Sequence, residues 1–451
     1  MHTRHIFLPI LTVWFFAGCG IYNSYERDDM PVADSLYRTA DSQQALDTLP
    51  QWDKFFSDPY LKKLIERGLA SNADMRMATL AVDRAQASLS ASRLAYLPSL
   101  NLAGDASLDH FNDTSKKTYA IGAEASWQID IFGRLTNARR AAKAALLQSE
   151  SYRQAVQARL VATIAESYYS LLLLDAQIEI ASQTVVNWRQ TTSTLEALKE
   201  AGRSNEAAVQ QTRAQQLSLE ADLVTLRHQL YTLENSLCAL LMEPPHAVER
   251  GSLKNTALPQ QLATGLPAQL LNNRPDLQQA EAVLMEHFYN VEAARAAFFP
   301  MVTLSGTLGW TNSHSGISVN PAQIFVNLAG SLLQPVFNRG TLRANYRVAQ
   351  ANRQAALTSY QQALLNAGNE VNEALSQCQT SAARIALDTS RVAALTRAVE
   401  HTTSLMSYGS SSYLEVLTAQ QSLLTAQLTL ADDRYRQLAA TASLYQALGG
   451  R

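Results

Sequence analysis

The chain has 451 residues, a formal net charge of −2 at pH 7 and 17% charged side chains. A nearly neutral chain carries no electrostatic signal for nucleic acid, so we expect no nucleic-acid partner. The sequence has no phosphate loop, no nucleophile elbow and no zinc-protease motif, which predicts a protein that is not an enzyme and has no cofactor, catalytic residue or bound metal.

The N-terminus resembles a bacterial lipoprotein signal. Arg4 precedes the apolar run Ile6–Phe16, which is too short to cross a bilayer as a helix. Small residues then lead to Cys19. Residues 1–18 are therefore predicted to be a signal peptide, and Cys19 is predicted to carry the lipid anchor in the outer membrane. The alternative is an ordinary secretory signal with an incidental cysteine.

Residues 19–51 are polar and irregular and are predicted to form an N-terminal arm. The pattern from 52 to 97 is helical, with a start at Asp58-Pro59 and a break between Gly68 and Asn72. Pro98 ends this helix because proline lacks the N–H that a helix needs.

A β-hairpin is predicted next, with strands at about 98–108 and 119–131 and a polar loop at 109–117. Apolar and polar residues alternate in both strands, at a length of about ten residues that fits a transmembrane β-strand. The alternative is a soluble two-sided sheet. Aromatic residues near strand ends favour the membrane: Tyr119, Trp127, Trp310, Phe325 and Phe337.

A helical hairpin is predicted at about 136–243, because this stretch contains no proline and its only glycine is Gly202. A narrow apolar stripe rich in alanine and serine suits coiled-coil packing of neighbouring helices. Cys238 and a second internal cysteine, Cys378, lie in helical stretches and are expected to pack rather than to form a disulfide.

The scheme then occurs a second time. The first structural repeat covers 52–245, a linker covers 246–267, and the second repeat covers 268–451. The helix that starts at Pro275 stops at Pro300, as the earlier one stops at Pro98. Strands follow at about 300–311 and 323–334, and then a helical hairpin at about 340–448, broken at Gly409.

Four candidate membrane strands cannot close a barrel within one chain, since the smallest single-chain membrane barrels have eight. Open sheet edges cannot lie in hydrocarbon, so the barrel must be shared between chains. Two chains would give eight strands and three would give twelve. Polar residues on one strand face would line the interior: Asn101, Asp105, Glu124, Gln128, Thr303 and Thr307.

The chain resembles the TolC-type outer membrane efflux proteins, in the lipoprotein branch that serves resistance–nodulation–division pumps. The resemblance rests on the duplicated plan, on Cys19, and on three motifs: Arg274-Pro275-Asp276, Phe298-Phe299-Pro300 and the stretch from Tyr413 to Leu423. It implies a homotrimer with a twelve-stranded outer membrane β-barrel over a periplasmic α-helical coiled-coil barrel. It also implies docking of a periplasmic adaptor protein and passive export of small toxic compounds, powered by an inner membrane pump.

The resemblance assigns two further sites. The helix tips where the adaptor would dock are Gly202, Arg203, Ser204, Gly409, Ser410 and Ser411. The periplasmic gate would involve Glu415, Tyr408, Tyr413 and Thr418, although the family often has an acidic residue where Thr418 stands.

Other functions stay open. The channel could serve type I protein secretion or a heavy-metal pump, although the eight methionines are scattered and form no soft-metal relay. A purely structural coiled-coil lipoprotein is the third hypothesis, and the four amphipathic strands argue against it.

Overall fold

The computed structural model describes residues 23–27, 51–112, 114–256, 274–314, 317–318, 324–408 and 411–450. The chain divides into two compact units. One consists of 1–30, 80–151 and 278–362, and the other of 31–79, 152–277 and 363–451. Each unit takes segments from both expected repeats, so the compact units do not coincide with the repeats along the chain.

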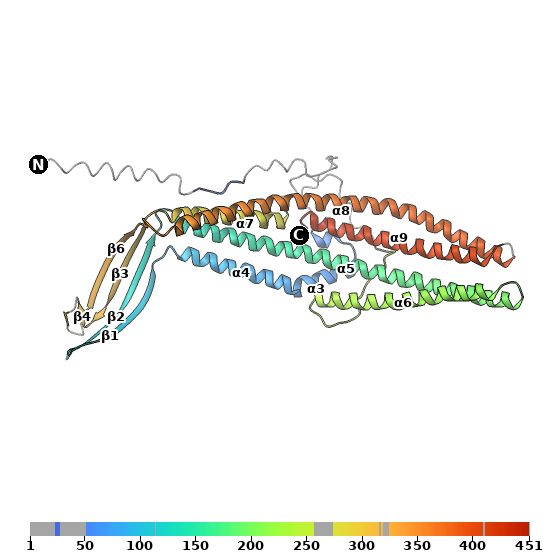
Figure 1. Cartoon of the computed structure of the whole chain (residues 1–451), viewed down its shortest axis with the longest axis horizontal. Coiled ribbons are helices and arrows are strands. Elements are labelled where there is room, and N and C mark those ends of the chain that lie inside the picture. The colour runs from blue at the N-terminus through green and yellow to red at the C-terminus, as the bar shows by residue number, and fades with distance from the viewer. Residues whose placement is uncertain are drawn as a thin grey trace. The chain divides into compact units, whose positions relative to one another are not determined.

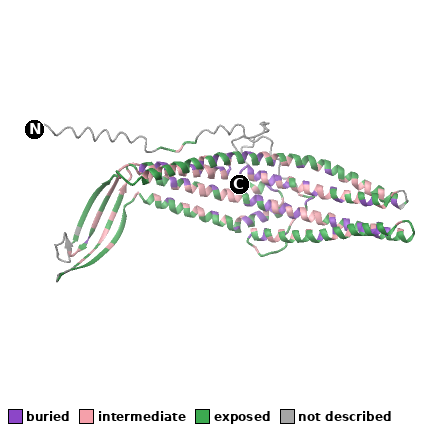
Figure 2. Ribbon diagram, viewed as in Figure 1, coloured by how far each residue is buried: buried purple, intermediate pink, exposed green. Residues whose placement is uncertain are grey.

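The first unit contains a four-stranded antiparallel sheet in the order β1-β2-β3-β6 (Figure 1). Its bounds are Ser99–Phe111 for β1, Thr114–Ile129 for β2, Met301–Thr311 for β3 and Ile324–Leu333 for β6. Two short strands, β4 at Ser313–His314 and β5 at Ile317–Ser318, pair with each other. The buried residues are concentrated on the helices, whereas the strands are mostly exposed (Figure 2).

The first hairpin differs from the prediction, because β1 and β2 continue through the expected loop at 109–117. His110 pairs with Ser115 and Phe111 with Thr114. The polar side chains that suggested a loop bond across the hairpin instead, with His110 Nδ1 2.8 Å from Ser115 Oγ. Asn112 has φ +50°, and this left-handed backbone lets a tight turn connect the strands.

The helices at the start of the chain are α2 (Trp52–Phe55), α3 (Pro59–Ser71) and α4 (Ala73–Leu94). The predicted break at Gly68–Asn72 falls at Asn72, whose side chain accepts hydrogen bonds from the N–H groups of Asp74 and Met75. Gly68 lies inside α3 and breaks nothing. A Cβ at this position would lie 2.4 Å from Ile164 Cδ1, so the Ile164 side chain would have to shift to accommodate it.

The long helices are α5 (Arg134–Glu200), α6 (Glu206–Leu240), α8 (Thr341–Ser407) and α9 (Tyr413–Ala447). α5 is followed by α6, and α8 by α9, after short turns (Figure 1). No helix among the described residues is long and apolar enough to cross a bilayer.

The helix α7 (Pro275–Ala296) begins at the predicted proline, and Arg274 immediately before it is 4% exposed. The Arg274 guanidinium donates to the Ala447 carbonyl at 2.7 Å, to Asp276 Oδ2 at 2.6 Å and to Glu370 Oε2 at 2.6 Å. Burial lowers the Arg274 pKa, but the two carboxylates outweigh burial and raise it overall. Arg274 therefore ties the start of α7 to α8 and to the end of α9.

The largest buried cluster lies in the second unit and joins α2, α3, α5, α6 and α9. Phe55 packs against Tyr445 with ring centroids 4.8 Å apart. The Tyr168 hydroxyl donates to Asp58 Oδ2 at 2.6 Å and accepts from the Gly251 N–H at 3.1 Å. Burial, and then the hydrogen bond to Asp58, raise the Tyr168 pKa. Asp58 also caps α3, so this hydroxyl ties α5 to the start of α3.

We predict that Tyr168 makes the free energy of unfolding fall as the pH becomes alkaline. A raised pKa in the folded state contributes stability that is present below the unfolded tyrosine pKa of about 10 and lost as pH rises above it. Tyr168→Phe should lose about 1–3 kcal/mol at pH 7, because Asp58 and the Gly251 N–H lose their partner. The difference in unfolding free energy between wild type and Tyr168→Phe should become smaller above about pH 10, since phenylalanine cannot ionise.

Thermal unfolding followed by circular dichroism, in steps from neutral to alkaline pH, measures this difference. Tyr231→Phe is the matched control, because Tyr231 is exposed and should have no effect. A difference between Tyr168→Phe and wild type that stays constant with pH would contradict the assignment.

Candidate functional site

The turn between α5 and α6 ends α5 with a Schellman motif. The Gly202 N–H donates to the Lys199 carbonyl at 2.9 Å, and the Arg203 N–H donates to the Leu198 carbonyl at 2.8 Å. Gly202 has φ +71°, a conformation that glycine adopts without strain. Gly202 and Arg203 are exposed and Ser204 is half-buried, so this tip presents its backbone to solvent.

The turn between α8 and α9 contains the other predicted tip residues. Gly409 and Ser410 lie outside the described residues. Ser412 caps α9 by accepting a hydrogen bond from the Glu415 N–H at 3.4 Å, and the Ser411 hydroxyl donates to the Glu415 carboxylate. The two tips are joined, because the Tyr413 hydroxyl donates to Gln211 Oε1 at 3.4 Å.

The predicted gate residues lie at the two ends of this second turn. Tyr408 follows α8 and is 82% exposed, Tyr413 begins α9 and is half-buried, and Glu415 and Thr418 are exposed in the first turns of α9. The structure brings these four residues to one tip. Their role in closing a channel stays a prediction.

Glu415 has a local role that the sequence reasoning missed. Ser412-Tyr413-Leu414-Glu415 has the spacing of a capping box, Ser-x-x-Glu, in which the serine caps the third helical residue. The serine half is present here, and the Glu415 carboxylate bonds to Ser411. A scan for that pattern would have found it. The effect of the Glu415 charge must therefore be measured separately from the effect of the helix cap at the start of α9.

Next to the first tip, charged residues join α5 to α6. Lys199 Nζ lies 2.9 Å from Glu206 Oε2, and the Gln210 side chain donates to Glu206 Oε1 at 2.6 Å. These hydrogen bonds, first that from Gln210 and then that from Lys199, lower the Glu206 pKa. A further ion pair joins Arg189 to Glu220 at 2.7 Å.

Below the tips, the two hairpins share an apolar cluster that contains Trp188 of α5, Leu219 of α6 and Leu424 of α9. The Gln420 amide of α9 donates to Thr191 Oγ1 of α5 at 3.1 Å. Sequence periodicity alone could not identify these contacts, because it does not say which helices pair.

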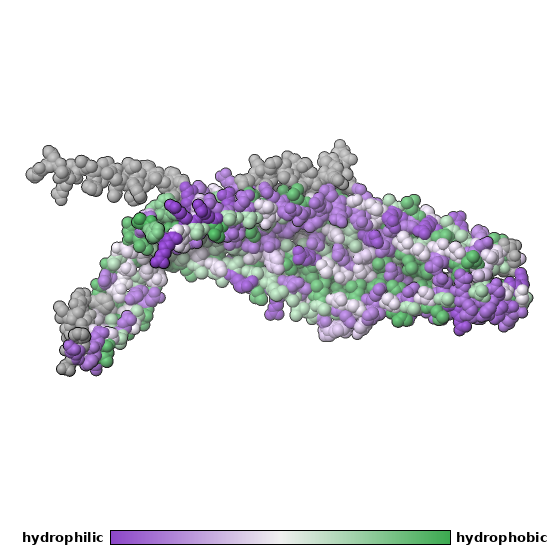
Figure 3. All heavy atoms as spheres, in the orientation of Figure 1, coloured by the Kyte–Doolittle hydropathy of each residue, from purple (hydrophilic) through white to green (hydrophobic). Residues whose placement is uncertain are grey.

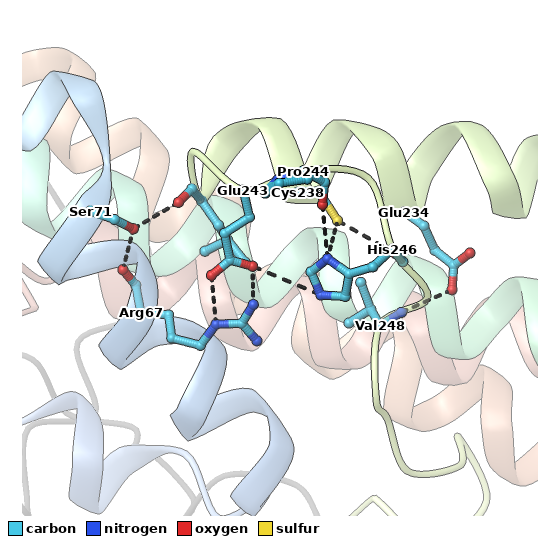
Figure 4. A network of polar contacts seen from close by, with 9 residues as sticks. Arg67, Ser71, Glu234, Cys238, Glu243, Pro244, His246 and Val248 are labelled. Atoms are coloured by element: carbon cyan, nitrogen blue, oxygen red, sulfur yellow. Dashed lines mark hydrogen bonds and ion pairs between the residues drawn. The ribbon is translucent and has the colours of Figure 1, made fainter.

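A cysteine, a histidine and a glutamate lie together near the end of α6 (Figure 4). Cys238 Sγ is 3.4 Å from His246 Nδ1, and His246 Nε2 is 3.8 Å from Glu243 Oε2. His246 Nδ1 also lies 2.9 Å from the Pro244 carbonyl, which can only accept, so this nitrogen carries the proton and is not a base for the thiol. Cys238 is fully buried and, like Cys378, a free thiol, as expected of a packing residue.

The network around this cluster holds the end of α6 against α3. Arg67 forms a two-pronged ion pair with Glu243, and the Ser71 hydroxyl donates to the Leu241 carbonyl at 2.7 Å (Figure 4). Across the described segments, no group of three or more His, Cys, Asp or Glu residues is arranged to hold a metal ion.

The sheet has one polar and one apolar face. Asn101, Glu124, Thr307 and Asn327 are register partners, so they form one polar row across all four strands. The next row consists of Leu102, Ala123, Leu308 and Val326. The apolar face is exposed and includes large side chains from every strand: Leu100, Leu102, Ile121, Trp127, Leu304, Leu308, Trp310, Val326 and Leu328.

The fold is that of the outer membrane efflux channels. The solved structure of the channel CusC matches with a TM-score of 0.86 and 32% identity, over 95% of this chain and 99% of that chain. A model described as "Outer membrane efflux protein" matches residues 64–241 and 266–450. The chain therefore belongs to the outer membrane efflux protein family, as the sequence motifs predicted.

Three relatives are similar over almost the whole chain. The cation efflux system protein CusC of Escherichia coli (strain K12) is 32% identical over 458 residues, 98% of each chain. The probable outer membrane lipoprotein SilC of Salmonella typhimurium is 30% identical over 452 residues, again 98% of each. The solvent efflux pump outer membrane protein SrpC of Pseudomonas putida is 28% identical over 459 residues, 98% of this chain and 97% of that one.

Proposed function

We propose that this chain is the outer membrane channel subunit of a tripartite efflux system and passively conducts small toxic compounds from the periplasm to the exterior. The observation that carries the proposal is the similarity to efflux channels along 98% of the chain. The exposed apolar sheet face supports it, because such a face is stable in lipid and costly in water.

The strands require partner chains. β1 and β6 are the two edges of the sheet, and their outer N–H and C=O groups would be unsatisfied in hydrocarbon. Pairing β6 of one copy with β1 of the next satisfies both edges. Three copies give a closed twelve-stranded barrel, with the polar row of Asn101, Glu124, Thr307 and Asn327 toward the interior.

The long helices of three copies would form the periplasmic α-helical barrel, and their tips would receive the adaptor protein of an inner membrane resistance–nodulation–division pump. The exposed backbone at Gly202 and Arg203 and the hydrogen bond between Tyr413 and Gln211 support a joint docking surface of both tips. Ser204, Gly409, Ser410 and Ser411 complete the proposed surface.

Cys19 is the proposed lipid anchor, and the similarity to the probable lipoprotein SilC supports this. The mature N-terminal peptide should therefore carry acyl chains on Cys19. An unmodified Cys19 in the mass spectrum of that peptide would contradict the assignment.

A second cargo class is metal cations, because CusC, at 32% identity, is named for a cation efflux system, whereas SrpC is named for a solvent pump. Deleting the chain in its own host should lower tolerance to organic solvents and drugs, or, in the second case, to heavy-metal cations. Restoring the wild-type chain should restore tolerance. Unchanged tolerance to all these compounds would contradict an efflux function.

If Glu415 closes the channel through its charge, removing that charge and removing the helix cap should have different effects on conductance. Glu415→Gln removes the charge and keeps a polar partner for Ser411, so it should increase planar-bilayer conductance roughly tenfold, since a charge-assisted hydrogen bond contributes about 1.5–3 kcal/mol. Ser412→Ala removes the cap and keeps the charge, so it should lower helix stability with little change in conductance. Equal conductance in both variants and wild type would contradict the gate.

A further inference from the structure

The starts of α5 and α8 are strongly basic, and both helices directly follow a membrane hairpin. α5 begins with Arg134, Arg139, Arg140 and Lys143, and no acidic residue occurs before Glu150. Around the start of α8 stand Arg339, Arg343, Arg347 and Arg353, and no Asp or Glu occurs anywhere between Glu292 and Glu370. The same charge bias therefore occurs in both repeats.

This placement opposes the helix dipole. The N-terminus of a helix carries partial positive charge, which favours acidic side chains and disfavours basic ones. Neither α5 nor α8 has an acidic residue in its first turn. At α5 the Asp130 carboxylate accepts hydrogen bonds from the N–H groups of Leu135 and Thr136, at 3.0 and 2.8 Å, and so compensates the helix start. No such carboxylate is close in sequence to the start of α8, where the basic residues are left without a local acidic partner.

Arg139, Arg140 and Arg353 each lie over an aromatic ring, so part of the basic set has partners within the chain. Within the described ranges, Arg134, Arg339, Arg343 and Arg347 have no ion pair, and all four are exposed. Arg134 donates a hydrogen bond to the Met301 sulfur at 3.7 Å.

Exposed apolar side chains lie beside the basic residues. They belong to the two turns that connect a strand to a long helix, 130–133 and 334–340, which we call the seam turns. Val336 is 94% exposed, Phe337 is 86% exposed, and Ile131 is also exposed. Figure 3 shows hydrophobic side chains next to strongly hydrophilic ones where the strands meet the helices. Water disfavours this apolar surface, whereas the boundary between lipid headgroups and acyl chains accommodates both kinds of side chain.

A third observation is that a segment near the N-terminus also contacts the basic start of α5. Residues 23–27 lie against this region of the first unit: the Arg140 guanidinium donates to the Asn23 carbonyl at 3.0 Å, and Arg27 forms an ion pair with Glu281. The Tyr25 ring packs edge-on against Phe288 with centroids 5.8 Å apart.

We propose that the basic starts of α5 and α8, together with the seam turns, bind the anionic headgroups of phospholipids such as phosphatidylglycerol. The guanidinium groups of Arg339, Arg343 and Arg347 form charge-assisted hydrogen bonds with headgroup phosphates, and Val336 and Phe337 enter the adjoining acyl region. This inference rests on the proposed function, because it places the strands in the outer membrane. It adds a lipid ligand and the residues that bind it.

The test compares lipid affinities of the full chain in mild detergent by native mass spectrometry. Wild type should retain phosphatidylglycerol in preference to phosphatidylethanolamine. The triple variant Arg339→Gln, Arg343→Gln, Arg347→Gln should lose this preference by roughly tenfold or more, since each basic residue near an anionic surface contributes about a factor of five. The matched control is Arg213→Gln, Arg227→Gln, Arg397→Gln, which removes three exposed arginines from the helices far along the sequence from the seam turns and should keep the preference.

The preference of wild type should also fall as salt is added, because counterions screen the contact. This measurement keeps the test decisive if the triple variant does not fold. Equal affinity of wild type for the two lipids, an equal loss in the control variant, or displacement of the lipid by the same concentration of inorganic phosphate would overturn the inference.

Wild-type conductance in a bilayer of phosphatidylethanolamine distinguishes failure of the lipid site from failure of the proposed channel function. A conducting channel without lipid preference contradicts only the lipid site. Absence of conductance contradicts the proposed function.

Discussion

The unpaired edges of the four-stranded sheet are the constraint on which the proposed assembly depends. β1 and β6 each expose one row of backbone N–H and C=O groups, and the apolar face beside them is exposed from Leu100 to Leu328. Lipid satisfies the face but not the edges, because hydrocarbon offers no hydrogen bonds. Only a further strand satisfies an edge. In the proposed assembly, neighbouring copies of the same chain supply these strands symmetrically.

The helical unit solves a different problem. Its core contains large side chains such as Tyr168, Trp188 and Tyr445, and polar contacts at defined points add specificity to their packing. Arg274 joins the start of α7 to α8 and α9, and Tyr168 joins α5 to the start of α3. The hydrogen bond from Tyr413 to Gln211 joins the two tips. These contacts set the helix register that the proposed docking and gating require.

Much of the fold was predictable from local rules. Alternation along the strands gave the polar and apolar faces, and Pro98, Pro275 and Pro300 marked helix limits to within a few residues. The error concerned the turn of the first hairpin, where polar residues pair with near neighbours on the opposite strand. The polar residues at 109–117 suggested a loop, but they pair across the hairpin. The predicted break between Gly68 and Asn72 is confirmed, and it lies at Asn72, between α3 and α4.

The sites were less accessible to sequence reasoning. The sequence brought Tyr408, Tyr413, Glu415 and Thr418 to one tip through their proximity in the chain. It did not reveal that Glu415 bonds to Ser411 beside a serine cap, or that Arg274 is buried, since burial of an arginine depends on carboxylates and carbonyls from other helices. The basic starts of α5 and α8 are visible in the sequence, but their lack of ion pairs in the described segments emerged only from the structure.

The mass of the assembly tests the central claim most directly. Extraction from membranes in mild detergent, followed by native mass spectrometry without heating, should give a complex of three copies that separates into single chains when heated. A stable, folded single chain under the same mild conditions would contradict the claim that the sheet edges require partner chains.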